Sequence, residues 1–308
     1  MKTIKVFAPA SVANVGCGFD VLGFALEEPG DELILRMKKS SGVTIKNESQ
    51  YNSFSLNPEK NCAGKSLLKF LEAMNSKQGI EISFKKKIKP GSGIGSSAAS
   101  ATASVFAANE LFGKPFSECE LVKFAMAGEA IASGSEHADN VAPSLLGGFI
   151  LIRSYSPLDL VKLPYPRKMF CALVQPDIEV KTIEARNILK KEIEFKKAIV
   201  QWGNVAGLIS GLASSDFSLI GRSLEDVIVE PVRSGLIPGY FDVKKSAMDN
   251  GALGCNISGS GPSVFALCDD YHIAEKVGLW MQKAFEKKNI QCQKYVSRIN
   301  HRGAIILN

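Results

Sequence analysis

A glycine- and serine-rich loop that runs into an alanine-rich segment is the feature that most constrains this chain of 308 residues. The stretch reads Pro90-Gly91-Ser92-Gly93-Ile94-Gly95-Ser96-Ser97-Ala98-Ala99-Ser100-Ala101. Its glycines lack Cβ atoms, so successive backbone N–H groups can turn toward one point and a bulky anion can approach closely. The stretch therefore predicts an anion-binding loop.

A helix is predicted directly after the loop, over residues 96–111. Neither proline nor glycine interrupts these residues, Ser96 or Ser97 can cap the start, and Gly113 can end the helix. The free N–H groups and the dipole at such an N-terminus favour a phosphate by about 1 kcal/mol. Two interpretations stay open at this point: a phosphate site, or a tight turn that packs a small-residue helix against a sheet.

Three motifs of other nucleotide-binding and hydrolytic proteins are not found in the sequence. Gly64-Lys65-Ser66 has the ending of a Walker loop, but Glu59 stands where the first glycine is required. The three loop glycines are one residue short of the G-x-G-x-x-G spacing of a Rossmann fold. No G-x-S-x-G nucleophile elbow occurs.

The net charge is +6, and its densest cluster is the four lysines within residues 85–89, just before the loop. This cluster would favour a phosphate ligand, or it forms the solvated edge of a strand. No aromatic residues are interleaved with it and no nucleic-acid-binding motif accompanies it. We therefore expect no nucleic-acid partner.

The seven cysteines are scattered and never in C-x-x-C spacing, which indicates reduced thiols rather than disulfides or zinc ligands. No apolar stretch is long enough for a transmembrane helix, and no targeting segment is recognisable at the start of the sequence. The sequence therefore predicts a soluble, cytoplasmic protein with no membrane partner.

Predicted strands and helices are mixed along the whole chain without an internal repeat, which favours an α+β fold in two domains. We expect strands at 4–8, 33–37, 43–46, 80–88, 147–152, 170–174, 256–257 and 263–267. We expect helices at 63–75, 96–111, 116–131, 182–189, 195–210 and 273–288. The proline-rich stretch 157–166 predicts a linker or long turn, so the domains are taken as 1–165 and 166–308.

Three segments, residues 8–20, 90–101 and 256–263, resemble the three motifs of the GHMP kinase superfamily, in the same order. Members of this superfamily phosphorylate small molecules such as galactose, homoserine and mevalonate. The strings Ser11-x-Ala13-Asn14-x-Gly16-x-Gly18-Phe19-Asp20, Glu136-His137-Ala138-Asp139-Asn140 and Glu230-Pro231-Val232-Arg233 resemble its homoserine kinase branch. The resemblance implies an N-terminal domain like ribosomal protein S5, a C-terminal domain like a ferredoxin, and an active site between them.

The resemblance also implies that ATP is the co-substrate and Mg²⁺ the metal ion. The ATP-binding residues would be Asn61, near the adenine, and Pro90, Gly91, Ser92, Gly93, Ile94, Gly95, Ser96, Ser97, Ala98 and Ala99. Magnesium prefers hard oxygen ligands and keeps several waters, so one hydroxyl and one carboxylate suffice. By resemblance these belong to Ser97 and Glu129.

The acceptor implied by the resemblance is L-homoserine, which carries a carboxylate, an ammonium group and a hydroxyl group. Arginines would bind the carboxylate, an acid the ammonium or hydroxyl group, and neutral side chains the rest. The expected residues are Asn14, Asp20, His137, Thr182, Arg186, Arg233, Gly259 and Ser260. Taken singly, each is also explained as a turn residue, a satisfied polar residue or a surface charge.

The residues expected to act in catalysis are Glu129, Asp139, Asn140 and Arg186. Relatives such as mevalonate kinase carry an aspartate that resembles a catalytic base near this helix, whereas this sequence has Asn140, flanked by Asp139. Two hypotheses stay open. Either Asn140 orients the hydroxyl group while its proton passes to a phosphate oxygen, or Asp139 is the general base.

The resemblance thus predicts a kinase that makes O-phospho-L-homoserine, the step before threonine. The alternatives are a kinase for another small alcohol, or a non-catalytic sensor that binds ATP and a metabolite. Because members of the superfamily often form dimers, a homodimer is expected as well.

Overall fold

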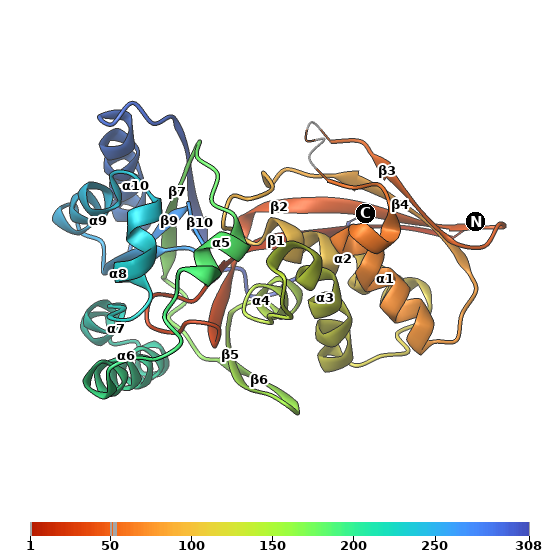
Figure 1. Cartoon of the computed structure of the whole chain (residues 1–308), viewed down its shortest axis with the longest axis horizontal. Helices are drawn as coiled ribbons and strands as arrows, with labels where there is room; N and C mark the ends of the chain where they lie inside the picture. Colours follow the sequence, from red (N-terminus) through yellow and green to blue (C-terminus); the bar gives the residue numbers. More distant parts are fainter. Residues whose placement is uncertain (1, 50, 52–53, 308) are drawn as a thin grey trace.

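Two β-sheets with helices packed against them organise the chain in the computed structural model, which describes residues 2–49, 51 and 54–307 (Figure 1). The first sheet contains seven strands among these residues, in the order β11-β1-β2-β4-β3, with β5 on β2 and β6 on β5. They are β1 (Thr3–Ala13), β2 (Leu22–Lys38), β3 (Val43–Asn47), β4 (Gly79–Lys85), β5 (Phe149–Tyr155), β6 (Leu158–Leu163) and β11 (Ile305–Leu307).

Strand β2 pairs with β5 near its start and with β4 near its end, and so connects the two parts of the first sheet. Its first residues, Leu22 to Phe24, pair with β5, and its later residues, Glu32 to Lys38, pair with β4. Leu33 and Leu35 alternate with more exposed neighbours, as expected for a strand with one face on the core.

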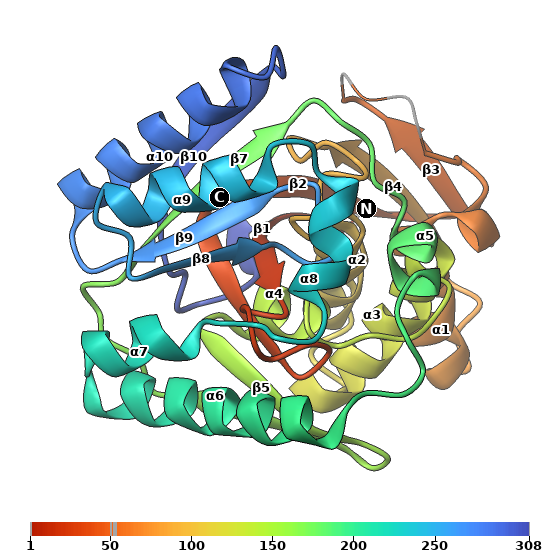
Figure 2. The same ribbon diagram turned by 60° about the vertical axis from the view of Figure 1, so that its left-hand side comes forward.

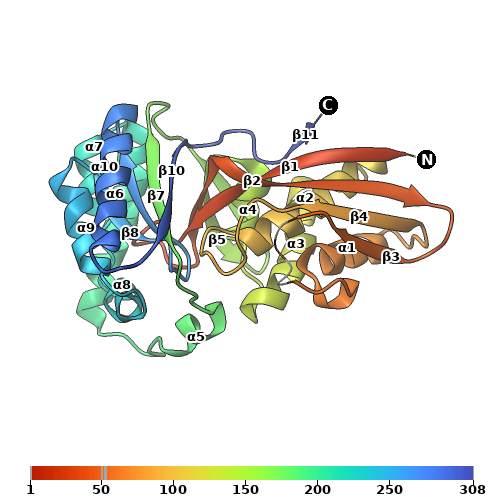
Figure 3. The ribbon, with the colours of Figure 1, turned by 90° about the horizontal axis from the view of Figure 1, so that it is seen from above.

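Helix α2 (Ser96–Leu111) lies at the centre of a helical layer on one face of this sheet (Figure 3). It contacts β1 and β2 on one side and α1 (Cys62–Ala73), α3 (Glu118–Ser133) and α4 (Val141–Leu146) on the others. Alanine and serine make up most of its buried residues, which suits a helix with neighbours on nearly every side. A short 3-10 helix, η1 (Pro58–Lys60), precedes α1.

The second sheet is four-stranded and antiparallel, in the order β10-β7-β9-β8. Its strands are β7 (Phe170–Pro176), β8 (Gly254–Ile257), β9 (Val264–Cys268) and β10 (Cys292–Arg298). Helices α9 (Tyr240–Asp249) and α10 (Tyr271–Glu286) lie side by side on one face (Figure 2). The remaining elements of this half are α5 (Thr182–Asn187), α6 (Phe195–Ser214), α7 (Phe217–Ser223), α8 (Glu230–Arg233) and η2 (Ser234–Leu236).

The two faces of strand β7 belong to two different hydrophobic clusters, because successive side chains point to opposite faces of the sheet. Cys171 and Leu173 belong to the large cluster that continues into the first sheet, whereas Ala172 and Val174 face α9 and α10. The halves are also joined by backbone pairing, since Leu26 forms an isolated bridge with Ile299. The second sheet is therefore covered on both faces, which explains its nearly continuous apolar strands.

The prediction of an α+β fold is confirmed, and α2 has the predicted bounds. Two expectations about the extent of the strands are wrong. Residues 158–163 form β6 rather than a linker, because they pair with β5. Strand β4 ends at Lys85 rather than at Ile88, because the backbone N–H groups of Lys87 and Ile88 turn away to donate to Asp31.

Several elements were not predicted: the first half of β2, and α4, α7, α8, α9, β6, β10 and β11. The boundary predicted at residue 165 lies between β6 and β7 and stays a prediction, and β11 returns from the second half of the chain to pair with β1. Among the described residues, no helix combines the length and apolar character needed to cross a membrane. All seven cysteines are free thiols.

Candidate active site

A cavity of about 700 Å³ lies where the end of β1, the start of α2, α5 and the loop between β8 and β9 meet. Most residues expected at the site line it: Asn14, Asp20, Asn61, Pro90, Gly91, Ser92, Gly93, Gly95, Ser96, Ser97, Glu129, His137, Asp139, Asn140, Thr182, Arg186, Arg233, Gly259 and Ser260. The side chains of Ile94, Ala98 and Ala99 lie in the hydrophobic core instead. The N–H of Ala99 already donates to the Gly95 carbonyl, so it is not available to a ligand.

The glycine loop is held against the β8–β9 loop at close range. Gly93 has φ +79°, and a Cβ at this position would lie 2.4 Å from the carbonyl oxygen of Gly261. The Ser258 hydroxyl donates to the Gly93 carbonyl at 2.7 Å, and the Ser263 hydroxyl donates to the Ser92 carbonyl at 2.6 Å. Only glycine fits at residue 93, because both the positive φ and the contact exclude a side chain.

The N-terminus of α2 has no side-chain cap, so the expectation that Ser96 or Ser97 caps it is wrong. The N-cap is Gly95 in the left-handed conformation, with φ +70°. The Ser96 hydroxyl is used elsewhere, since it donates to the carbonyl of Ile88 at 3.1 Å. The first turn of α2 therefore presents backbone N–H groups without a side-chain partner beside the cavity, as an anion site requires.

Glu129 of α3 and Ser97 of α2 lie side by side in the cavity wall. Glu129 is buried, and its Oε2 atom has no hydrogen-bond partner in the described part of the chain. Burial raises the pKa of this carboxyl group to about 7, although the Ser97 hydroxyl and the charge of Lys86 act in the opposite direction. An unpartnered carboxylate oxygen next to a hydroxyl group is a donor set that fits Mg²⁺.

A bidentate ion pair joins the β1–β2 turn to α5. The guanidinium of Arg186 donates from Nη2 to Asp20 Oδ1 at 2.8 Å and from Nη1 to Oδ2 at 3.1 Å. His137 Nδ1 lies 3.8 Å from Asp20 Oδ1, and burial is the main cause that lowers the pKa of His137. Arg186 Nε is buried without a partner among the described residues, so one donor is free for an anionic ligand.

Phe19 lies within cation–π distance of two arginines, and nothing in the sequence assigned it a role. The guanidinium carbons of Arg186 and Arg233 lie 5.3 and 5.0 Å from its ring centroid. Arg233 is buried, and it donates to the carbonyl oxygens of Ala185 and Gly259, each at 3.0 Å. Burial and the neighbouring Arg186 lower the pKa of Arg233 to about 10. Two cations thus contact one aromatic ring, and their proximity favours the binding of an anion nearby.

Asn140 is fixed beside the glycine loop. Its Oδ1 accepts a hydrogen bond of 2.8 Å from the hydroxyl of Ser11, so its amide NH₂ group remains as a donor. Asp139, the preceding residue, is only 4% exposed. Burial, together with the charges of Asp20 and Glu129, raises the pKa of Asp139 to about 7.

One contact within the second half of the chain and one between the two halves also border the cavity. The hydroxyl groups of Thr182 and Ser260 are 3.2 Å apart, and the Asn14 amide donates to the carbonyl of Gly259 at 2.8 Å. Thr182 and Arg186 both lie on α5 and both line the cavity, as their spacing predicts.

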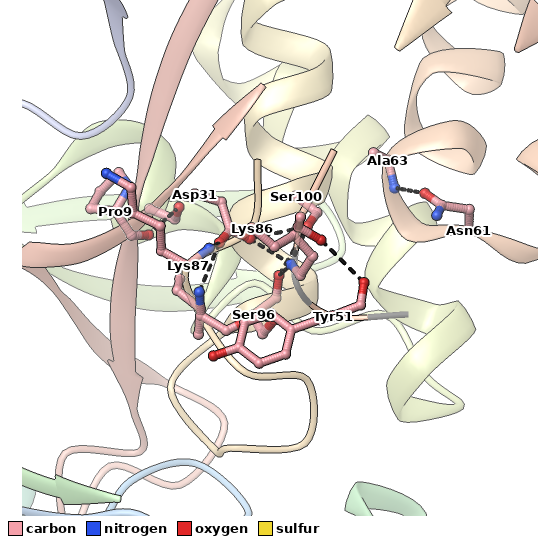
Figure 4. A network of polar contacts seen from close by, with 12 residues as sticks. Pro9, Asp31, Tyr51, Asn61, Ala63, Lys86, Lys87, Ser96 and Ser100 are labelled. Carbon is pink, nitrogen blue, oxygen red and sulfur yellow. Dashed lines mark hydrogen bonds and ion pairs between the residues drawn. The ribbon is translucent and has the colours of Figure 1, made fainter. Parts of the chain in front are cut away.

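Asn61 lines the cavity as the N-cap of α1, where its Oδ1 accepts from Ala63 N and Gly64 N (Figure 4). Lys86 also lines the cavity, although the run of lysines gave no signal that distinguished it. Its side chain is only 5% exposed and pairs with the fully buried Asp31. Lys85 and Lys87 on either side are exposed.

Matches to two family models define the class of protein to which this chain is similar. The family model for the GHMP kinases N terminal domain matches residues 61–148, and the model for the GHMP kinases C terminal domain matches residues 208–287. A homoserine kinase of Chlorobium phaeobacteroides is 51% identical, with both chains covered in full. A homoserine kinase of Chlorobaculum tepidum is 49% identical, with 100% of this chain and 99% of the other covered.

A crystal structure of homoserine kinase from Cytophaga hutchinsonii superimposes with a TM-score of 0.96 at 53% identity, covering 100% of this chain and 98% of the other. The chain therefore belongs to the homoserine kinase family of the GHMP kinases. The resemblance inferred from the three sequence motifs and the predicted GHMP kinase fold are confirmed.

Proposed function

We propose that this protein transfers the γ-phosphate of ATP to the hydroxyl group of L-homoserine, giving O-phospho-L-homoserine and ADP in threonine biosynthesis. One observation carries the proposal beyond family membership. Three residues that line the same cavity each carry a buried polar atom without a partner among the described residues: Ser92 Oγ, Glu129 Oε2 and Arg186 Nε. They are a donor in the glycine loop, an oxygen for a cation and a donor for the acceptor's carboxylate.

The triphosphate binds to residues 90–97, with its oxygens on the N–H groups of the loop and of the first turn of α2. Asn61 lies near the adenine. Ser97 and Glu129 hold Mg²⁺, and the free Oε2 atom of Glu129 supports this role. When bound, Mg²⁺ neutralises charge on the phosphate oxygens. The side chains then mainly hold the acceptor hydroxyl and the γ-phosphate in position, because phosphoryl transfer needs little covalent chemistry from the protein.

The acceptor binds in the part of the cavity formed by Asp20, Arg186 and Arg233. Its ammonium group pairs with Asp20 and its carboxylate with the two arginines. Since Asp20 and Arg186 bind each other before the substrate arrives, binding replaces this ion pair by two others: Asp20 with the ammonium group, and the substrate carboxylate with the two arginines. Asn14, His137, Thr182 and the 259–260 backbone surround the rest of the molecule.

The Asn140 amide orients the acceptor hydroxyl toward the γ-phosphate, and the hydroxyl proton passes to a phosphate oxygen. The hydrogen bond from Ser11 supports this role, because it fixes the amide with its NH₂ group free to donate. Asp139 is the competing proton acceptor. Its pKa of about 7 is close to the value at which a general base works best near neutral pH.

The experiment that tests the function measures ADP release with homoserine, threonine, serine, mevalonate and galactose as acceptors. We expect kcat/KM to be highest with homoserine. Higher values with another alcohol would identify a different small-molecule kinase. If calorimetry shows binding of ATP and homoserine while no ADP is released, the protein is a sensor and the proposal is wrong.

Cytoplasmic location and a homodimer are further parts of the proposal. The free thiols of all seven cysteines support a reducing compartment. Sedimentation of the purified protein measures the oligomeric state directly.

A further inference from the structure

A buried ion pair lies beneath the first turn of α2, outside the set of residues assigned above. The ammonium group of Lys86 donates to Asp31 Oδ2 at 2.5 Å, to the Ser96 carbonyl at 3.0 Å and to the Ser100 hydroxyl at 2.7 Å (Figure 4). A lysine has three N–H donors, so all of them are in use. Lys86 therefore reaches the cavity wall without a free donor for a phosphate.

Asp31 of β2 is equally saturated. Its Oδ1 accepts the backbone N–H groups of Lys87 and Ile88 at 2.9 and 3.0 Å. Its Oδ2 accepts from Lys86 and lies 3.3 Å from the Ser100 hydroxyl. Asp31 thus fixes the backbone where the chain leaves β4 to enter the glycine loop, while Lys86 fixes the backbone where the chain leaves the loop to enter α2.

The two ends of the loop are also tied to each other. The Ser96 hydroxyl donates to the Ile88 carbonyl, and the carbonyl of the same Ser96 accepts from Lys86. Ser97, the neighbour of Ser96, is the hydroxyl ligand proposed for the metal. A shift of the Ser96 carbonyl would therefore move both the N–H groups of the first turn and the Ser97 side chain.

Stability alone does not explain a pair at this depth. Side-chain exposure is 5% for Lys86 and 0% for Asp31. Burying two charges costs several kcal/mol for each ion, and apolar replacements of similar volume are often as stable or more so. The neighbouring Lys87 shows the ordinary arrangement, since it pairs with Glu32 and is 53% exposed.

We propose that Lys86 and Asp31 are positioning residues for the nucleotide: together they clamp the two ends of the glycine loop, so that the phosphates meet a preformed site. This inference rests on the proposed function for the identity of the nucleotide. Because a preformed site loses less conformational entropy on binding, the clamp acts on nucleotide affinity and not on the acceptor side of the cavity.

The test compares Lys86→Met, the double variant Lys86→Met/Asp31→Asn and the control Lys87→Met. The single variant leaves an unpaired buried carboxylate and can fail to fold. The double variant removes both charges, while the amide oxygen of the introduced asparagine can still accept the N–H groups of residues 87 and 88. The Lys87→Met control removes a lysine from the same run without touching the clamp.

The measurements are calorimetric binding of MgADP, the KM values for ATP and for homoserine, and the melting temperature. For the folded double variant we expect Kd for MgADP and KM for ATP to rise at least tenfold and KM for homoserine to change less than twofold. A purely structural defect would lower the fraction of active protein without altering either constant. Lys87→Met should behave as wild type.

Wild-type nucleotide affinity in the folded double variant would overturn the inference, and so would an equal rise of both KM values. A failure of the proposed function is visible separately, because wild-type protein would then release no ADP with homoserine. MgADP binding would still test the clamp in that case.

Discussion

At the scale of single residues, the acceptor part of the cavity concentrates charge around Phe19. Asp20 neutralises one of the two arginines there, whereas Arg233 donates to two carbonyl oxygens and forms no ion pair within the described residues, and its pKa is lowered to about 10. The positive charge that remains favours the binding of an anion at this site. The sequence motif contained Phe19, but an aromatic residue in a turn gives no signal that it will contact two cations. Lys86 was equally hidden among three other lysines.

Arg186→Met should weaken acceptor binding with little effect on the nucleotide. Loss of charge-assisted hydrogen bonds costs about 1.5–3 kcal/mol, so we expect KM for homoserine to rise by roughly 10- to 100-fold. Steady-state kinetics with each substrate varied in turn measures this. Arg222→Met, on the exposed face of α7, is the matched control. An unchanged KM for homoserine in Arg186→Met would remove Arg186 from the acceptor site.

Asp139→Asn should make stability less dependent on pH. Burial raises the pKa of Asp139 from 3.8 to about 7, so its contribution to folding is complete below pH 3.8 and is lost as the pH rises from there through 7. Each tenfold change in proton affinity corresponds to about 1.4 kcal/mol, and this value sets an upper limit on the unfolding free energy that is lost as the pH rises. Urea unfolding between pH 5 and pH 8 should therefore show a smaller decline for Asp139→Asn than for wild type. Parallel declines would show that the carboxyl group is not perturbed.

The same variant decides between the two proton acceptors. If the proton passes to a phosphate oxygen, Asp139→Asn keeps near-normal turnover and the wild-type pH profile. A large loss of kcat, with folding and substrate binding intact, would establish Asp139 as the general base.

At the scale of elements, the site depends on two loops that meet by their backbones. The residue types at positions 90–111 were enough to predict the loop and the bounds of α2. The end of β4 was not predictable, because Asp31 on another strand captures the backbone of residues 87 and 88. β6 was not predicted for two reasons. Pro157 and Pro164 flank it and favour a linker, and its pairing with β5 cannot be inferred from the sequence of the segment alone. The acceptor residues come from five separated segments, and only the family resemblance joined them in advance.

Gly93→Ala should damage both stability and nucleotide binding. A positive φ costs an alanine about 1–2 kcal/mol, and the contact at 2.4 Å with the Gly261 carbonyl adds an overpacking cost of about 1–3 kcal/mol. Gly113→Ala is the control, since its φ is also positive but its Cβ would meet nothing within 4 Å. Equal losses in unfolding free energy for the two variants would contradict the close contact between the loops.

At the scale of the whole molecule, the two sheets share one hydrophobic cluster. Phe265 of β9 packs against Phe24 of β2 with ring centroids 5.9 Å apart, and Leu173 and Leu267 belong to the same cluster as Leu33. The active site therefore lies between parts that are held together by apolar packing. The mixed pattern of strands and helices predicted an α+β fold, but not that β11 would return to the first sheet.

Because of this shared cluster, we expect the protein to unfold in a single cooperative transition. Scanning calorimetry should give a ratio of calorimetric to van't Hoff enthalpy of about 1. MgADP should shift the whole transition upward. Two resolved transitions would show that the halves are independent.

Phosphoryl transfer to homoserine can be observed directly by ³¹P NMR of the protein with ATP, Mg²⁺ and L-homoserine. We expect the γ-phosphate signal of ATP to be replaced by a phosphomonoester resonance, split into a triplet by the adjacent CH₂ group of the acceptor. ADP should accumulate in equal amount, and the resonance should be absent without homoserine. Formation of inorganic phosphate alone, or no loss of ATP, would contradict the assignment of homoserine as the phosphoryl acceptor.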